Sequence, residues 1–280
     1  MTTQLTDTLG LLTYQISRET FGRQIDQILR AAYEQKYQVL ISIAPSRTSR
    51  EPLDDQTREI KQLLSQGIDG LLIHTRGDKK ESERIVNTVR GRVPVVTFNR
   101  PTASLSGVVL DDAASYYEAT NHLSRLGHER IGFVGPDWNG ASPILAKAKG
   151  RSLAMQKHDL VHELPPASGI YAKGGYLQGK MLGDRFTALV CRDDYTAIGV
   201  CHGLREAGIR VPEDVAVVGN GDIGLAESMT PALTTLATPY AAIAQAAMEL
   251  MLEQFEGGQE SRQITLQSPL IVRESCGAKL

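Results

Sequence analysis

The sequence lacks a long hydrophobic run, and this absence excludes a membrane-spanning protein. No stretch approaches the roughly 18 apolar residues that a transmembrane helix needs. The opening residues, MTTQLTDTLGLLTYQ, carry no basic segment followed by a long apolar one, so they do not resemble a secretory signal. Cysteine is scarce as well, because Cys191, Cys201 and Cys276 form no C-x-x-C pair and their odd number argues against a disulfide framework. We therefore expect a cytoplasmic protein that makes no contact with a membrane.

The sequence also lacks a bias toward charge of one sign. It has 30 basic and 32 acidic residues, which gives a net charge of −2. A module that binds nucleic acid by itself usually has a basic surface, so the composition does not favour direct nucleic-acid binding. The length of 280 residues, with 41% hydrophobic and 22% charged residues, is typical of a globular protein with two α/β lobes.

Catalytic and metal-binding motifs are also missing. The chain has no G-x-S-x-G sequence and no other recognisable nucleophile motif. His158 and His162 have the i, i+4 spacing of a zinc-binding helix. However, Pro165 and Pro166 follow at once, and no third ligand comes at the spacing of that motif. We expect no metal, no cofactor and no enzymatic activity.

What the sequence does contain is a regular alternation of short apolar runs with helix-length periodic stretches. This alternation is typical of βαβ units and predicts parallel sheets. Gly67 and Gly127 suit the C-terminal ends of two of the helices. The expected strands are 8–14, 38–44, 68–74, 93–99, 106–112, 130–135, 187–193 and 214–220, with two extended pieces in 262–275, and the segment 232–239 precedes the last helix. The expected helices are 21–37, 53–67, 80–91, 113–127, 143–158, 174–183, 195–208 and 240–258.

Several short strings appear in the order found in one family of proteins. They are GIDGLLI, VPVVTFNR, LGHERIGFVG, DDYTAIGV, GIRVPEDVAVVG, PALTTL and LIVRES, and with the strands around them they extend from Leu9 to Ser275. In these strings the chain resembles the effector-binding core of the LacI/GalR transcription regulators. The resemblance implies an α/β fold like that of type I periplasmic binding proteins. In that fold two doubly wound parallel-sheet lobes are joined by three crossovers, with a small molecule held between them. The implied N-terminal lobe is 7–104 with 239–262, and the implied C-terminal lobe is 105–238 with 263–276.

The resemblance also implies a function and partners. We expect the effector-binding and dimerisation domain of a regulator such as a repressor, which forms a homodimer and senses a small polar, sugar-like metabolite. Operator DNA would be contacted only through a helix-turn-helix domain. Because the first strand is expected to begin near Leu9, we do not expect that domain within this chain. The alternative is a free-standing solute-binding protein that serves a sugar transport system.

Candidate ligand-binding residues follow the expected strands, because ligands of open α/β sheets bind outside the carboxyl ends of the strands. These residues are Tyr14, His74, Asn99, Asp193 and Asn220.

The resemblance adds Phe21, Arg100, Lys147 and Asp222 as candidates. Trp138, the only tryptophan, is a further candidate because it follows the end of an expected strand and could stack on a flat ligand. For Phe21 the alternative is helix packing, for Trp138 a surface loop, and for Lys147 a solvated helix face. The chain departs from the family at several of these positions. Lys147 and Leu145 stand where the family has arginines, and Gly221 replaces an aspartate that commonly grips ligand hydroxyls. Asp193 replaces an asparagine that often contacts the ligand in the family. Asp194, next to it, keeps the aspartate of the family pattern, and the alternative role for Asp194 is a helix N-cap. These departures make an ordinary sugar effector doubtful.

The segment VAVVGNGDIG, residues 215–224, offers a competing interpretation. Gly219, Gly221 and Gly224 match the G-x-G-x-x-G spacing of a dinucleotide-binding loop. That loop belongs on the first strand of its domain, followed at once by a helix and by an acidic residue about 20 positions later. Here the glycines lie on one of the last strands, and Thr230 and Pro231 are expected to interrupt any helix that follows. We therefore expect this segment to contribute to a ligand site without binding a dinucleotide.

Overall fold

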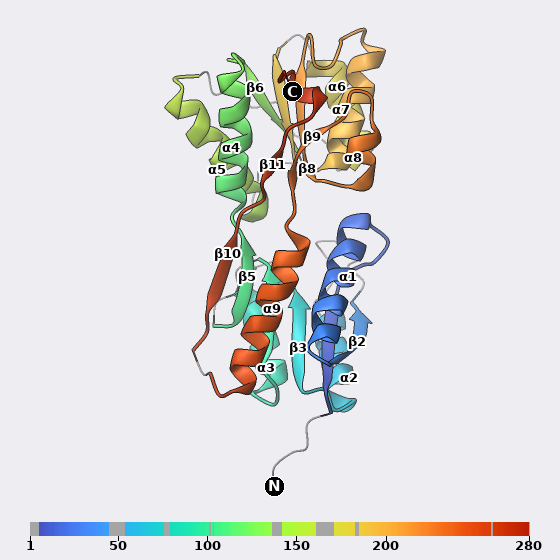
Figure 1. The fold of residues 1–280 in the computed structure, drawn as a ribbon, viewed down its shortest axis with the longest axis vertical. Coiled ribbons are helices and arrows are strands. Elements are labelled where there is room, and N and C mark those ends of the chain that lie inside the picture. The colour runs from blue at the N-terminus through green and yellow to red at the C-terminus, as the bar shows by residue number, and fades with distance from the viewer. Residues whose placement is uncertain are drawn as a thin grey trace. The chain divides into compact units, whose positions relative to one another are not determined.

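The computed structural model describes residues 6–44, 54–75, 79–100, 102, 104–135, 142–160, 171–182, 185–258 and 260–279. The chain divides into two compact units, and it passes from one to the other three times (Figure 1). Unit 1 consists of Met1–Leu110 with Pro239–Leu266. Unit 2 consists of Asp111–Thr238 with Gln267–Leu280.

Unit 1 is built on a parallel sheet of six strands in the order β10-β5-β4-β3-β1-β2. The strands are β1 (Thr8–Thr13), β2 (Gln38–Ile43), β3 (Gly70–His74), β4 (Val95–Asn99), β5 (Ser106–Leu110) and β10 (Gln263–Leu266). Because all neighbouring strands are parallel, the carboxyl ends of β1, β3 and β4 lie at the same edge of the sheet.

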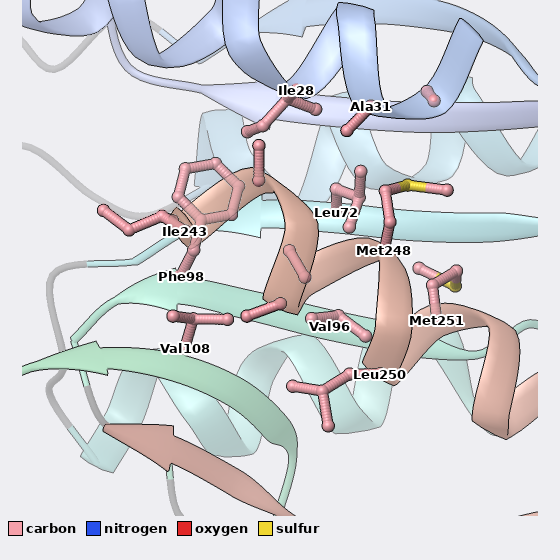
Figure 2. Packing of buried hydrophobic residues seen from close by; sticks show 14 of the residues in the cluster. Ile28, Ala31, Leu72, Val96, Phe98, Val108, Ile243, Met248, Leu250 and Met251 are labelled. Atoms are coloured by element: carbon pink, nitrogen blue, oxygen red, sulfur yellow. The ribbon is translucent and has the colours of Figure 1, made fainter. Parts of the chain in front are cut away.

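Helices cover both faces of this sheet. The helices α1 (Glu19–Glu34) and α9 (Tyr240–Phe255) pack on one face, and α2 (Asp54–Ser65) and α3 (Lys79–Val89) pack on the other. The alternation of side chains along a strand explains this arrangement, since Leu9 and Leu11 face α1 and α9 while Leu12 faces α2 and α3. Figure 2 shows the hydrophobic cluster on the face covered by α1 and α9, in which side chains of α1, β3 and α9 point toward one another.

Unit 2 is built on a sheet of five strands in the order β11-β9-β8-β7-β6. The strands are β6 (Ile131–Val134), β7 (Ala188–Cys191), β8 (Ala216–Gly221), β9 (Thr234–Ala237) and β11 (Leu270–Ile271), and only β11 is antiparallel to its neighbour. The helices α4 (Asp112–Arg125) and α5 (Ser142–Lys157) cover one face, and α6 (Tyr171–Leu182) and α7 (Asp194–Glu206) cover the other. Two short helical segments complete the unit, α8 (Gly224–Ser228) and a 3-10 turn at Glu274–Cys276.

The helices α6 and α7 approach each other through glycines. Gly175 and Gly179 of α6 pack against Gly199 and Gly203 of α7. A Cβ atom on any of the four would collide with a backbone carbonyl of the opposite helix. These glycines cost helix propensity, but they allow two backbones to pack in direct contact.

The doubly wound parallel α/β fold expected from the sequence is confirmed. Gly67 and Gly127 follow helices in the left-handed backbone region, with φ of 76° and 92°, as expected of helix C-terminal positions. The helix that follows β8 is short, as expected from Thr230 and Pro231, because α8 ends at Ser228. Five residues fit between the end of the loop and those breakers. Within the described ranges, no helix is both long and apolar enough to cross a membrane.

Candidate functional site

Four of the candidate residues of unit 1 gather at the carboxyl edge of its sheet, and we call them the unit 1 cluster. Tyr14 directly follows β1, His74 ends β3, Asn99 ends β4, and Phe21 lies in the first turn of α1. The Phe21 ring stacks on the His74 ring, with 4.8 Å between the ring centres and 26° between the planes. Tyr14 meets His74 edge-on at 5.6 Å. Asn99 Nδ2 lies 2.7 Å from His74 Nε2. All four side chains are half-buried.

Asn99 is held in an unusual conformation. Its φ of 80° lies in the left-handed region, which asparagine tolerates better than most residues. Gln24 Nε2 donates a hydrogen bond of 3.4 Å to Asn99 Oδ1, and this contact leaves the Asn99 amide nitrogen directed at His74. Arg100 follows as a half-buried residue, and its carbonyl oxygen accepts a hydrogen bond of 3.1 Å from the Thr75 hydroxyl.

Two buried polar residues that the sequence did not suggest support Tyr14. The Tyr14 hydroxyl donates a hydrogen bond to Glu81 Oε1. Gln56 Nε2 donates to the same oxygen at 3.0 Å, and the side chains of Glu81 and Gln56 are both buried. Glu81 lies in the first turn of α3, where a carboxylate is favoured by the helix dipole. Gln56 and Glu81 lie on helices, and neither follows a strand nor matches a motif of the resembled family, so no signal in the sequence identified them.

In unit 2 a buried tyrosine links two candidate residues. Tyr116 of α4 is fully buried, and its hydroxyl lies 2.8 Å from the carbonyl oxygen of Arg192, where it donates a hydrogen bond. The same hydroxyl accepts hydrogen bonds from Lys147 Nζ at 3.3 Å and from Asn220 Nδ2 at 3.1 Å. Lys147 Nζ also lies 4.9 Å from the centre of the Tyr116 ring and 3.9 Å from Asp112 Oδ1. Burial raises the pKa of Tyr116 well above its usual value, so the hydroxyl keeps its proton.

The candidate carboxylates of unit 2 already have partners within the protein. Asp193 forms the N-cap of α7, where its Oδ1 accepts from Thr196 N at 2.8 Å, and its Oδ2 pairs with Arg192 Nε at 2.9 Å. Asp222 Oδ1 accepts from Arg273 Nη2 at 2.8 Å. Neither Arg192 nor Arg273 was predicted from the sequence.

Asp194 is not the helix cap, which corrects the alternative interpretation of that residue. It is fully buried, its Oδ1 accepts from the Thr235 hydroxyl at 2.5 Å, and its Oδ2 accepts from Ile223 N at 2.9 Å. Burial raises the pKa of Asp194 to about 6, although both hydrogen bonds oppose the increase. The carboxylate therefore connects the start of α7 to β9 and to the loop after β8.

Trp138 and His162, one histidine of the dismissed His158–His162 pair, lie outside the described residues. The other histidine, His158, has its Nε2 2.8 Å from Asn121 Oδ1. The structure thus brings together Tyr14, Phe21, His74 and Asn99 in unit 1. In unit 2 it brings together Lys147 and Asn220 through Tyr116.

The sequence and the fold are similar to those of known proteins. A family model for periplasmic binding protein-like domains matches residues 120–276. An uncharacterised HTH-type transcriptional regulator from Streptomyces limosus is 30% identical to this chain over 95% of the chain and 78% of the relative. The crystal structure of a LacI family transcriptional regulator from Enterococcus faecium with bound ribose has a TM-score of 0.80 and 25% identity, and the match covers 96% of this chain and 98% of that one. The lac repressor dimer bound to operator and the anti-inducer ONPF has a TM-score of 0.86 at 19% identity, over 98% and 95% of the two chains.

The fold and the family match define a periplasmic binding protein-like α/β domain. Within that class, the chain belongs to the LacI family of transcription regulators and is an effector-binding regulatory domain. This result favours the regulator over the transport protein that was the alternative. The relatives are regulators of transcription and not enzymes.

Proposed function

We propose that this chain senses a small polar metabolite, a sugar or a related compound. The binding groups that we propose are, within unit 1, the unit 1 cluster and, within unit 2, the Lys147–Tyr116–Asn220 group. The observation that carries the proposal is the unit 1 cluster, in which an aromatic stack and an amide meet at the carboxyl edge of a parallel sheet. Ligand sites of this kind combine aromatic walls with a few well-placed polar groups. The relative from Enterococcus faecium was solved with bound ribose, which supports a ligand of this class.

The unit 2 residues favour a ligand rich in hydrogen-bond acceptors. The carboxylates of Asp193 and Asp222 are neutralised by arginines of the protein. Lys147 and Asn220 contribute N–H donors, and both donate to the Tyr116 hydroxyl, because an ammonium group only donates and the Asn220 amide carries two N–H groups. Lys147 is a point charge and cannot clamp two oxygens as an arginine does. We therefore propose that the ligand presents hydroxyl lone pairs or an anionic oxygen to unit 2.

We further propose that the protein acts as a homodimer and that the ligand shifts the population of its conformations. Operator DNA would then be contacted by a helix-turn-helix domain, which the name of the Streptomyces relative indicates for that protein. The edge strand β2 supports self-association, because Leu40, Ile41 and Ile43 are 38%, 44% and 37% exposed. An exposed apolar edge strand commonly marks an interface with another chain.

Ligand binding is tested by thermal shift against a library of sugars, nucleosides and related metabolites. We expect at least one compound to raise the melting temperature of the wild-type protein. Phe21→Ala and His74→Ala should each abolish the shift, because they remove the aromatic stack. The matched control is Tyr33→Ala, which removes an aromatic ring that is 82% exposed in the same unit. An equal loss of the shift in the control and in the cluster variants would contradict the assignment of the site.

Dimerisation is tested by light scattering coupled to size-exclusion chromatography. We expect a dimer for the wild-type protein and a monomer for Ile41→Lys, because a lysine on the edge strand opposes pairing. The control is Val86→Lys on α3, where the replaced side chain is 41% exposed against 44% for Ile41, and this variant should remain a dimer. A strictly monomeric wild-type protein with no thermal shift against the whole library would refute the proposed function.

A further inference from the structure

A basic groove lies on the outer surface of unit 1, where α2 and α3 pack side by side. Its volume is about 660 Å³, and it is lined by Lys61 of α2, by Arg84 of α3, and by Arg90 and Arg92 in the connection from α3 to β4. Three neutral polar residues complete the lining, namely Thr57, Asn87 and Thr88. No acidic side chain is among the described residues that line this groove.

The cations of the groove have donors to spare. In the described part of the chain, Arg84 Nη1 is buried and has no hydrogen-bond partner. Arg90 and Arg92 donate to backbone carbonyls at the end of α3, with N···O distances of 2.9 to 3.2 Å. A guanidinium carries five N–H donors, so each of these arginines keeps several for a ligand. Lys61 is exposed at the mouth of the groove.

This arrangement contrasts with the arginines elsewhere in unit 1. Arg23, Arg30 and Arg262 each form an ion pair with a carboxylate of a neighbouring residue. Among the described residues, by contrast, no carboxylate forms an ion pair with any of the four cations of the groove, although the whole chain has a net charge of −2. Like charges repel when they are placed together, and this cost is offset when an anion binds among them.

We propose that this groove binds a phosphate group, as inorganic phosphate or as the phosphate of a small phosphorylated metabolite. Guanidinium groups match the oxygens of phosphate with two parallel hydrogen bonds, and the hydroxyl and amide groups of Thr57 and Asn87 can bind further oxygens. The volume suits a small ligand, since pockets for small molecules measure about 300 to 1,000 Å³.

The groove is separate from the unit 1 cluster. Arg92 lies just before β4, whereas Asn99 of the cluster ends that strand. The two sites are therefore at opposite ends of β4, on the amino and the carboxyl sides of the sheet. A phosphate bound in the groove would be a second input to the regulator, distinct from the ligand that the cluster binds.

The test is calorimetric titration of the full chain with inorganic phosphate at constant ionic strength. We expect saturable binding that is weakened about tenfold or more by Arg90→Gln, because a hydrogen bond to a charged group contributes about 1.5 to 3 kcal/mol. The double variant Arg84→Gln with Arg90→Gln should lose binding. The control Arg30→Gln removes one exposed positive charge from α1 and should leave the affinity unchanged.

Other outcomes would overturn the proposal. Equal weakening by Arg30→Gln, or equal competition by chloride, would mean that phosphate responds only to general charge. Loss of phosphate binding in His74→Ala, with no change in Arg90→Gln, would place the anion in the unit 1 cluster. Binding of a short DNA duplex, without binding of phosphate, would identify the groove as a nucleic-acid contact and would refute the small-anion site. Arg90→Gln changes an exposed side chain, so it keeps the test valid if the double variant fails to fold.

Discussion

Replacing Asp194 by asparagine should stabilise the folded protein above about pH 6 and change its stability little near pH 4. Asp194 is fully buried, and its carboxylate accepts hydrogen bonds from the Thr235 hydroxyl and from Ile223 N. An asparagine side chain preserves the shape of the group. Its oxygen can accept from Ile223 N, and its amide nitrogen can donate to the Thr235 hydroxyl. The variant therefore mimics the protonated form of Asp194.

The sign and the size of the effect follow from the pKa of Asp194. Burial raises this pKa from 3.8 to about 6 in the folded protein. Between these values the folded state holds a proton that the unfolded state has released. The stabilisation is thus complete below pH 3.8 and is lost as the pH rises through about 6. A shift of this size corresponds to about 3 kcal/mol, and this is the advantage expected for Asp194→Asn near pH 8.

The assay is urea unfolding followed by circular dichroism, at about pH 4 and at about pH 8. The free energy of unfolding should differ between the variant and the wild type only at the higher pH. The control is Asp214→Asn, because hydrogen bonds from Arg210 lower the pKa of the exposed Asp214 to about 2. That substitution should bring no gain at the higher pH. If Asp194→Asn changes the stability by the same amount at both pH values, then burial does not control the ionisation of this carboxylate.

The remaining predictions concern packing and the buried hydroxyl. Gly199→Ala should lower the free energy of unfolding by about 1 to 3 kcal/mol or more, because its Cβ would collide with the backbone of α6. Gly22→Ala is the matched control in α1, where a Cβ meets only one atom at 3.8 Å, and it should raise stability by up to about 1 kcal/mol in the same urea assay. Tyr116→Phe should weaken binding of the ligand found by thermal shift and should cost about 1 to 3 kcal/mol in urea unfolding, because buried carbonyls lose their donor. Unchanged binding in Tyr116→Phe would show that the hydroxyl does not position Lys147 and Asn220.

The order of strands and helices could be predicted because it depends on local patterns. Each strand of unit 1 is a short apolar run, and each helix shows the 3.6-residue period of one buried face. Ile28 and Ala32 on α1, for example, recur at this spacing, and both enter the core beneath the sheet. The residues at strand ends could be predicted for the same reason, since the end of an apolar run marks the carboxyl edge. Tyr14, His74 and Asn99 were found in this way.

The groups that support the site could not be predicted, because they depend on contacts between distant parts of the chain. Tyr116 has the spacing of an ordinary core residue of α4, and nothing in its neighbours indicates that its hydroxyl meets Lys147 and Asn220. Arg151 is a stronger case. It stands in a helix rich in lysine, yet it is fully buried, donates to the carbonyl oxygen of Ile131 at 3.0 Å, and has a pKa lowered to about 10 by burial.

The amino-acid composition likewise could not predict where charged residues lie together on the surface. A net charge of −2 argued against a basic surface, but an average says nothing about where charges gather. Lys61, Arg84, Arg90 and Arg92 come from two helices and a connection, and they line one groove only because α2 and α3 pack together.

The glycines of residues 219–224 show how one spacing can serve two chemistries. In a dinucleotide-binding loop, glycines let the backbone approach a pyrophosphate, and backbone N–H groups bind its oxygens. Here the anion belongs to the protein itself, because Ile223 N donates to Asp194 Oδ2 and a Cβ on Gly219 would collide with Asp194 Oδ1. Gly221 has a φ of 132°, which other residues rarely adopt. The glycines therefore accommodate a buried carboxylate where a dinucleotide fold would accommodate phosphate. Both hydrogen bonds to Asp194 lower its pKa, so Gly219→Ala, which should disturb them, is expected to raise this pKa further and to strengthen the pH dependence that Asp194→Asn abolishes.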